Sequence, residues 1–352
     1  MKRTLILFVG LLLAINIAAC GDDPAPAPEA EPEGNPEGTP EGTPEGTPEG
    51  EPEGNPDPGD PCAQIECVDG TPEDYNFDVP ASFFSGIVLE TDANIGEDIN
   101  GDGNPDNALG ALLSDLGGLL GDADLNQQLA ESIADGSLAL GATWPTFSAG
   151  VADSNDVDMH LFALEGPGPY LASRASFVEG TQSPRIQFNG AALAAGNLTA
   201  GPADFGLTIP LGDIALSLTV SDARLKGELA SDALGVAVTN GTLAGAVALG
   251  SIVDALNAFL QSDSCSCLGL QSPLIDLSLG AGPQACVGQF DDATCAAEGQ
   301  DICSTIAGAC ILAVPIIAGQ TDIDLDGDGE PDGISVFIRL ELTGAEITGP
   351  AN

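Results

Sequence analysis

The chain has 352 residues, of which 54 are Asp or Glu and only 7 are Lys or Arg, so its formal net charge is −47. So few cationic side chains cannot neutralise a row of phosphates, which argues against nucleic acid and anionic lipid surfaces as partners. The acidity is typical of cation-binding loops and also of a solvated surface adapted to a salty medium, and composition leaves both interpretations open.

The first residues have the layout of a secretory signal. Lys2 and Arg3 precede an apolar run from Leu5 to Ala19, which at about 15 residues is shorter than a membrane-spanning helix. The motif Ile17-Ala18-Ala19-Cys20 resembles the lipobox of bacterial lipoproteins. The resemblance implies a signal peptide at 1–19, a lipid on Cys20, export, and a lipid-anchored location at the outer membrane or cell surface. The alternative is an ordinary secretory signal that ends near a cysteine.

Residues 20–61 are predicted to form a disordered linker that starts at the lipidated cysteine. A four-residue repeat with Pro-Glu-Gly at its end runs from Glu31 to Gly54. Such a segment has no apolar residues with which to form a core, and its prolines and like charges favour an extended chain. It is interpreted either as a stalk or as a neutral repeat of no selected length. The folded body is then expected at 62–352.

The body is predicted to be mainly β, an antiparallel sandwich or barrel with a few short helices. Apolar and polar residues alternate with a period of two in many short runs, and turn sequences such as Asn189-Gly190, Gly212-Asp213 and Asn240-Gly241 separate them. The predicted strands are Gly86–Glu90, Val157–Leu164, Arg185–Leu193, Gly206–Leu211, Ile214–Val220, Leu234–Thr239, Leu243–Leu249 and Ile334–Leu342. The predicted helices are Asn107–Leu120, Asp124–Ala134 and Ser251–Leu260.

Two acidic loops have the spacing of calcium sites. Both place oxygen-bearing side chains at positions 1, 3, 5 and 9, with glycine at position 6 and a backbone carbonyl available at position 7. Calcium binds six to eight oxygens, and glycine permits the sharp turn that brings them together. The predicted ligand residues are Asp98, Asn100, Asp102, Asn104 and Asp106 in the first loop, and Asp324, Asp326, Asp328, Glu330 and Asp332 in the second.

These loops resemble the calcium loops of EF-hands, dockerins and thrombospondin type-3 repeats. The resemblance is incomplete, because those families have an acidic residue at position 12, where this chain has Leu109 and Ser335. Asp92, Glu97, Asp322 or water would have to complete the coordination, so we expect weak sites that ambient calcium keeps filled. The alternative is a pair of solvated acidic turns. A third acidic cluster, Asp153–Asp158, lacks the glycine and is interpreted as a hairpin turn.

The eight cysteines after Cys20 are predicted to form disulfides, because an exported chain meets an oxidising compartment. Cys62 and Cys67 are expected to pair with each other. The other six lie in a partly helical insertion at about 263–312, where Cys265 and Cys267 are each expected to pair with one of four later cysteines: Cys286, Cys295, Cys303 and Cys310.

The sequence contains no recognisable catalytic set. The single histidine, His160, lies in an alternating run and is interpreted as a residue on a strand face. We therefore expect a non-enzymatic, calcium-stabilised surface lipoprotein that serves as a structural or binding module of the cell envelope. The alternative is a lipid-anchored envelope hydrolase with an acidic, metal-assisted site. The partner, a protein or a surface polymer, is unknown.

Overall fold

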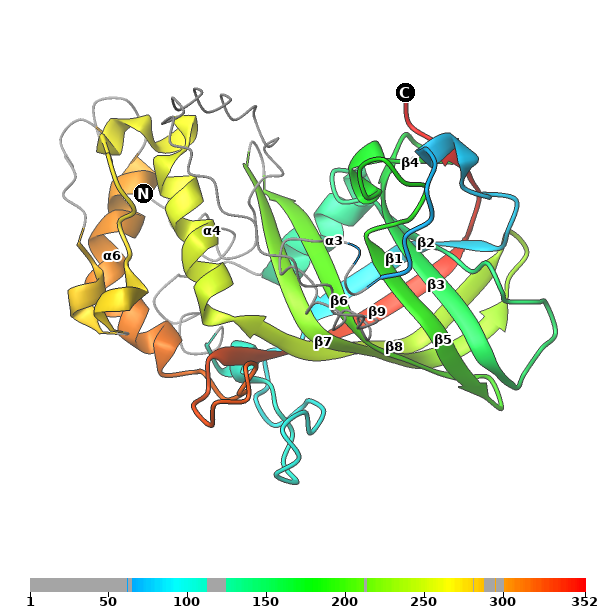
Figure 1. The fold of residues 1–352 in the computed structure, drawn as a ribbon, viewed down its shortest axis with the longest axis horizontal. Coiled ribbons are helices and arrows are strands. Elements are labelled where there is room, and N and C mark those ends of the chain that lie inside the picture. Colours follow the sequence, from blue (N-terminus) through cyan, green and yellow to red (C-terminus); the bar gives the residue numbers. More distant parts are fainter. Residues whose placement is uncertain are drawn as a thin grey trace, which may run out of the picture.

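The computed structural model describes residues 62, 65–112, 125–211, 214–280, 282–287, 295 and 301–352 (Figure 1). The strands are β1 (Ala81–Leu89), β2 (Leu140–Thr143), β3 (Ser154–Glu165), β4 (Tyr170–Ala172), β5 (Ile186–Ala194), β6 (Asn197–Leu211), β7 (Ile214–Ser231), β8 (Val236–Ala248), β9 (Gly333–Ala345) and β10 (Ile347–Pro350). The helices are α3 (Leu125–Asp135), α4 (Leu249–Gln261) and α6 (Asp301–Ala318). Short 3₁₀ turns lie at Pro72–Asp74, Arg174–Ser176, Asp263–Leu268, Leu277–Leu279 and Pro283–Ala285.

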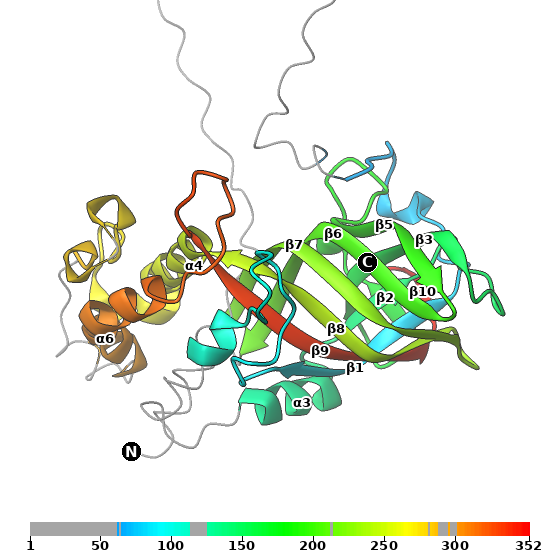
Figure 2. The same ribbon diagram turned by 90° about the horizontal axis from the view of Figure 1, so that it is seen from below.

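The strands close into an eight-stranded antiparallel barrel, as Figure 2 shows. The order is β3-β2-β1-β9-β8-β7-β6-β5, and the pairing of β5 with β3 completes the ring. Strands β4 and β10 pair in parallel beside the barrel. The mainly β fold class is therefore confirmed, and of the two predicted architectures the chain adopts the barrel.

The barrel is filled by one apolar core. Phe84, Met159 and Phe188 are buried in it together with Trp144, the only tryptophan of the chain. The Trp144 Nε1 donates to Ser82 Oγ at 2.8 Å, and this hydroxyl donates to the carbonyl of Val236 at 2.6 Å. The buried polar groups of the core are thus satisfied, and the interior is packed with side chains as in other small barrels.

Two predicted turns lie inside strands instead. Asn189 and Gly190 belong to β5, and Asn240 and Gly241 belong to β8, which joins two of the predicted strands into one. Gly190 has φ of 65° and Asn240 has φ of 52°, and the strand register shifts close to both. A positive φ serves a β-bulge as well as a hairpin turn, so the same residues can mark either feature. At Leu211 and Ile214, which pair, the predicted hairpin is confirmed.

The interpretation of Asp153–Asp158 as a hairpin turn is also wrong. Residues from Ser154 onward belong to β3, which pairs with β5. The Asp153 carboxylate accepts a hydrogen bond from the Ala195 amide at 2.9 Å, and Asp158 accepts one from Gly190, also at 2.9 Å. These side chains therefore accept hydrogen bonds from backbone amides in and beside the neighbouring strand β5. A strand that alternates apolar and polar residues can have acidic residues on its exposed face, so this cluster does not require a turn.

The predicted helices near 124–134 and 251–260 correspond to α3 and α4. Of the helix predicted at Asn107–Leu120, a helical turn at 108–112 is seen, and residues 113–120 lie outside the described part of the chain. Within the described ranges, no helix has both the length and the apolar character needed to cross a membrane.

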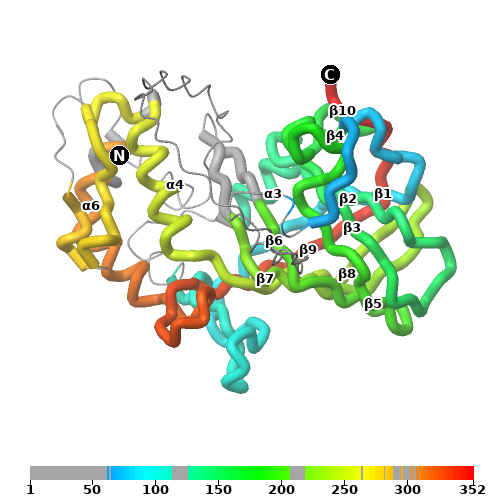
Figure 3. Tube along the Cα trace, in the orientation of Figure 1, coloured from blue at the N-terminus to red at the C-terminus, as the bar shows by residue number. Residues whose placement is uncertain are grey.

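A helical region lies between β8 and β9, at one end of the barrel (Figures 1 and 3). Residues of α4, the turn at 263–268 and α6 share a core of their own, which includes Phe259, Leu260 and Val314. Three disulfides cross this region: Cys265–Cys303, Cys267–Cys295 and Cys286–Cys310. The fourth joins Cys62 to Cys67. Both pairing predictions are confirmed, and four disulfides are typical of a protein that folds in an oxidising compartment.

The segment before β1 packs on the outer face of β3 through aromatic residues. Tyr75 and Phe77 contact Phe162 and Phe177. The Tyr75 hydroxyl lies 2.8 Å from His160 Nδ1 and 2.6 Å from Thr143 Oγ1. His160 is thus a residue on a strand face, and its ring is part of the contact that holds the segment on the barrel.

We expect acid to weaken this contact. Burial lowers the pKa of His160, although the Asp158 charge and a hydrogen bond donated by the ring to Asn189 oppose the shift. The folded chain therefore binds the proton less readily than the unfolded chain. The contribution of this contact to the free energy of unfolding is complete above about pH 6.5 and decreases as the pH falls below that value, by at most about 1.4 kcal/mol for each pH unit. Urea unfolding between pH 7.5 and 5.5 should show this slope in the wild type and lose it in His160→Gln. Equal slopes in the two proteins would contradict the assignment.

Candidate metal centre

The two acidic loops lie side by side at one end of β9 (Figures 1 and 2). The first loop, residues 98–106, precedes the helical turn at 108–112. The second, residues 324–332, runs directly into β9. They are separated by more than 200 positions in the chain, and the pairing of β1 with β9 brings them together.

Both loops have the same internal hydrogen bonds. In each, the carboxylate at position 1 accepts from the backbone amides at positions 4 and 6. In the first loop, Asp98 accepts from Gly101 at 2.7 Å and from Gly103 at 3.0 Å. In the second loop, Asp324 accepts from Gly327 and from Gly329, both at 2.8 Å. These four glycines have φ between 77° and 95°, a conformation that side-chain-bearing residues rarely adopt. The glycines therefore produce the turn that surrounds position 1.

The remaining predicted positions also match. The side-chain oxygen at position 3 accepts from the amide at position 5, and the carboxylate at position 5 accepts from the amide at position 7. The carboxylate at position 9, Asp106 or Asp332, accepts from the amide at position 2. The backbone groups of Asn104 and Glu330 are thus part of both frameworks. The two loops thus have the same conformation, and among the described residues only Asp324, Asp326 and Asp328 form a group of three carboxylates that could hold an ion.

The second loop brings three carboxylates together. One oxygen each from Asp324, Asp326 and Asp328 lies within 4.8 Å of the other two, and all three residues are exposed. Oxygens bound to one calcium ion at about 2.3–2.6 Å are at most about 5 Å apart, so this cluster can hold a metal ion. Without a cation, three like charges at this spacing repel one another. In the first loop, position 3 is an amide, Asn100, so only Asp98 and Asp102 carry charge among the first three ligands.

The three carboxylates that were expected to complete the coordination have other partners. Glu97 Oε2 lies 2.6 Å from Lys226 Nζ. The Asp92 carboxylate accepts from the Asn94 backbone and side chain. Asp322 accepts from the amide and the hydroxyl of Ser335 at 2.8 and 2.5 Å. These contacts do not place any of the three carboxylates among the loop ligands, so completion of the coordination by one of them or by water stays a prediction.

Ser335, at position 12 of the second loop, connects the two loops. Its side chain is fully buried; its hydroxyl donates to Asp322 and accepts from the amide of Ala108 at 2.8 Å. Ala108 follows the first loop by two residues, and Asp106 ends that loop with 6% of its surface exposed. Burial raises the pKa of Asp322, and the charge of Asp106 raises it further, while the hydrogen bonds from Ser335 oppose the shift. Sequence reasoning noted Ser335 only as a missing ligand, because its partner Ala108 is remote in the chain.

Replacing this hydroxyl should destabilise the protein. In Ser335→Ala, a backbone N–H and a half-buried carboxylate lose a partner, which should lower the free energy of unfolding by about 2–3 kcal/mol. Ser137→Ala is a matched control, because Ser137 is exposed and its hydroxyl contacts only exposed groups, the Ser132 carbonyl at 3.4 Å and the Asp135 carboxylate. Its effect should stay within about 0.5 kcal/mol. Urea unfolding curves measure both, and equal curves for the two variants would exclude a bridging role for Ser335.

Comparison with protein-family models, curated proteins and solved structures finds no match to this chain.

Proposed function

We propose that this chain is a non-enzymatic, calcium-stabilised lipoprotein of the cell envelope that acts as a structural or binding module. The repetition of one hydrogen-bond framework in two remote loops carries the calcium assignment. Both loops place several hard oxygens around glycine turns, which is the ligand type that calcium selects. Both also adjoin elements that pack on the barrel, so an ion bound there stabilises the fold and does not join two mobile helices.

The metal assignment is tested by calorimetric titration of the full chain, purified in detergent, with calcium chloride. We expect two weak sites with dissociation constants of about 10⁻⁴–10⁻³ M, the range of extracellular calcium modules. Asp324→Asn should remove one site and Asp98→Asn the other. Calcium at 10 mM is about ten times the weakest dissociation constant expected. Absence of binding heat at this concentration would mean that the two loops are acidic turns that bind no metal.

The anchor is part of the same proposal and has its own support. Cys20 and the linker lie outside the described residues, so the assignment depends on the lipobox resemblance at Ile17–Cys20. In cells fed labelled palmitate, the wild-type chain should carry the label. Cys20→Ala should carry no label and should be found in the soluble fraction. A variant with Cys62 and Cys67 both changed to serine should retain the label, which separates lipidation from loss of any cysteine. A labelled Cys20→Ala chain would exclude this anchor.

A further inference from the structure

Each acidic loop closes at a neck, where the chain that enters the loop is bonded to the chain that leaves it. The neck of the second loop consists of residues 322–323 and 333–335, in which Ile323 and Gly333 exchange two backbone hydrogen bonds of 3.1 and 2.8 Å. The neck of the first loop consists of residues 97 and 106–108, in which the Asp106 amide donates to the Glu97 carbonyl at 2.8 Å. Because the predicted ligands at positions 1 and 9 lie in or next to opposite sides of the neck, an ion that binds both holds the neck closed.

Ser335 joins the two necks. Its amide and its hydroxyl donate to the Asp322 carboxylate within the second neck, at 2.8 and 2.5 Å. The same hydroxyl accepts from the Ala108 amide of the first neck at 2.8 Å. The Ser335 side chain is fully buried, so water cannot take the place of either partner. Since each neck supplies one partner, the hydroxyl makes both bonds only when both necks are closed.

The charges at the necks favour closure of both together. Asp106 is buried, and its charge acts on the half-buried Asp322. Buried like charges repel more strongly than exposed ones, so an ion that offsets the charge of Asp106 lowers the cost of holding Asp322 against Ser335. Direct repulsion between two bound ions opposes this effect. The three clustered carboxylates of the second loop are exposed, however, and salt at about 0.15 M screens exposed charges over about 8 Å.

We propose that the two loops bind calcium cooperatively and that the Ser335 hydroxyl transmits the effect from one neck to the other. This inference rests on the calcium assignment proposed above and adds the regulation of the same sites. An ion in either loop closes the neck that holds one partner of Ser335, so the second ion binds where part of the ordering has already taken place. Thermodynamic linkage requires each loop to strengthen calcium binding by the other by the same factor, and we expect a factor of about five.

Two glycine amides follow the loops separately. The Gly103 and Gly329 amides, both at position 6, donate to the position-1 carboxylate of their own loop at 3.0 and 2.8 Å. Calcium chloride is titrated into the ¹⁵N-labelled full chain, in detergent with about 0.15 M sodium chloride, and both resonances are recorded. The same titration of Asp324→Asn measures the first loop alone, and that of Asp98→Asn measures the second loop alone.

Fitted together, the three titrations give the coupling factor. Each loop should fill at a higher calcium concentration in the variant that lacks the other loop, and the factor should be about five in both directions. Loops that fill at the same concentration with and without their partner, or at a lower one without it, would overturn the proposal. Binding heat in the wild type would then still support the calcium assignment, whereas absence of binding heat would refute the assignment and the cooperativity together.

Hydrogen exchange tests the transmission between the necks. Ala108 belongs to the first neck, but its amide donates to Ser335 of the second. In Asp98→Asn, where calcium fills only the second loop, calcium should slow exchange of the Ala108 amide several-fold. Because a general gain in stability also slows exchange, the reference is Asp98→Asn combined with Ser335→Ala, in which calcium should leave exchange at Ala108 unchanged. Equal effects of calcium in the two proteins would show that the second loop does not act on the first neck through Ser335.

Ser335→Ala tests the hydroxyl itself. This variant keeps every predicted ligand, so both loops should still bind calcium, with a coupling factor close to one. The fluorescence of Trp144, which is buried in the barrel core, shows whether the variant is folded during the titration. The titrations of Asp324→Asn and Asp98→Asn decide the proposal even if Ser335→Ala does not fold. A factor that stays near five in folded Ser335→Ala would exclude the hydroxyl as the route.

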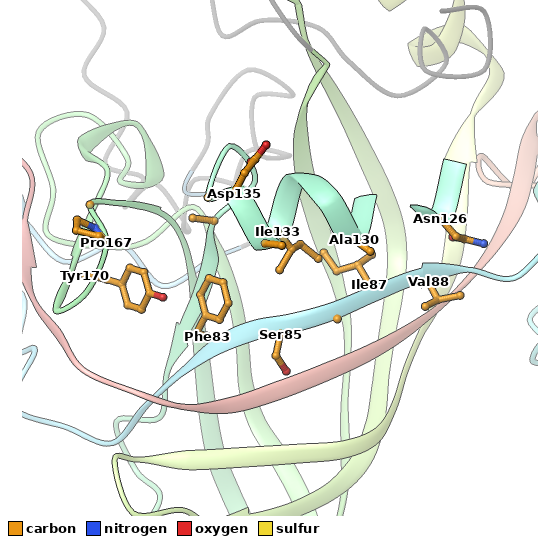
Figure 4. Close-up of a pocket in the computed structure, with 15 residues that line it drawn as sticks. Phe83, Ser85, Ile87, Val88, Asn126, Ala130, Ile133, Asp135, Pro167 and Tyr170 are labelled. Atoms are coloured by element: carbon orange, nitrogen blue, oxygen red, sulfur yellow. The ribbon is translucent and has the colours of Figure 1, made fainter. Parts of the chain in front are cut away.

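A control for net charge lies on helix α3. Figure 4 shows Asn126 beside Val88 at one end of this helix and Asp135 at the other end, next to a groove between α3 and β1. Asn126 bonds to Leu89, from which the chain leads to the first loop, so Asp135 lies at the end of α3 remote from that loop. Asp135→Asn removes an exposed carboxylate without touching either neck, and the coupling factor should be unchanged. A factor that falls as far as in Ser335→Ala would mean that net charge links the loops and would overturn the role of the hydroxyl.

Discussion

Calcium at 10 mM should raise the free energy of unfolding by about 3–5 kcal/mol relative to chelator. With dissociation constants of about 10⁻⁴–10⁻³ M, each filled site stabilises the folded state by about 1.4–2.7 kcal/mol. The physical reason is that the ion neutralises carboxylates that otherwise repel one another in the folded loop and are far apart in the unfolded chain. Urea unfolding followed by circular dichroism, with ionic strength matched by sodium chloride, measures the difference.

Variants divide this effect between the loops. Asp324→Asn and Asp98→Asn should each remove about half of the calcium-dependent stabilisation, and the double variant should unfold alike in calcium and in chelator. Asp156→Asn is the matched control, since it removes an exposed carboxylate of the third acidic cluster, whose residues lie in or beside β3. Magnesium at the same concentration should stabilise less, because it demands a smaller octahedral site. If the wild type is equally stable in calcium and chelator, the loops have no structural metal.

Removing the Cys265–Cys303 disulfide should destabilise the helical region by about 4 kcal/mol. The bond closes a loop of 38 residues, and chain-entropy arguments assign about that stabilisation to a loop of this length. The Cys62–Cys67 bond closes a separation of only 5 residues, so its removal should cost about 2 kcal/mol. The two double alanine variants therefore test loop length within one protein.

The single tryptophan makes this experiment local. Trp144 is buried in the barrel core, so its fluorescence follows the barrel, whereas ellipticity at 222 nm (the helical band) follows α4 and α6 more strongly. Because the helical region has its own core, the 222 nm transition of the Cys265→Ala, Cys303→Ala variant should move to lower urea and the Trp144 transition should stay near its wild-type position. Transitions that move together would mean that barrel and helical region unfold as one unit.

Local patterns were enough to predict much of this protein. Alternation of apolar and polar residues predicted seven of the strands in whole or in part, because a strand with one buried face requires that period whatever its neighbours are. The oxygen spacing around glycine predicted two loops of one conformation, since the turn and its hydrogen bonds lie within nine residues, and in the second loop it predicted the carboxylate cluster of Asp324, Asp326 and Asp328. The short spacings predicted the Cys62–Cys67 pair and predicted that Cys265 and Cys267 do not pair with each other, but they left open which of the four later cysteines each of them joins.

The tertiary structure alone decided how these pieces meet. Whether the strands form a sandwich or a barrel depends on the pairing of β3 with β5, and whether Asn240-Gly241 turns or bulges depends on β9, which is nearly 100 residues away. The bridge from Ser335 to Ala108 likewise needs a segment that is remote in the chain. A residue's neighbours in sequence set its conformation, but its hydrogen-bond partners across a sheet are set by the closure of the whole fold, for which no local period exists.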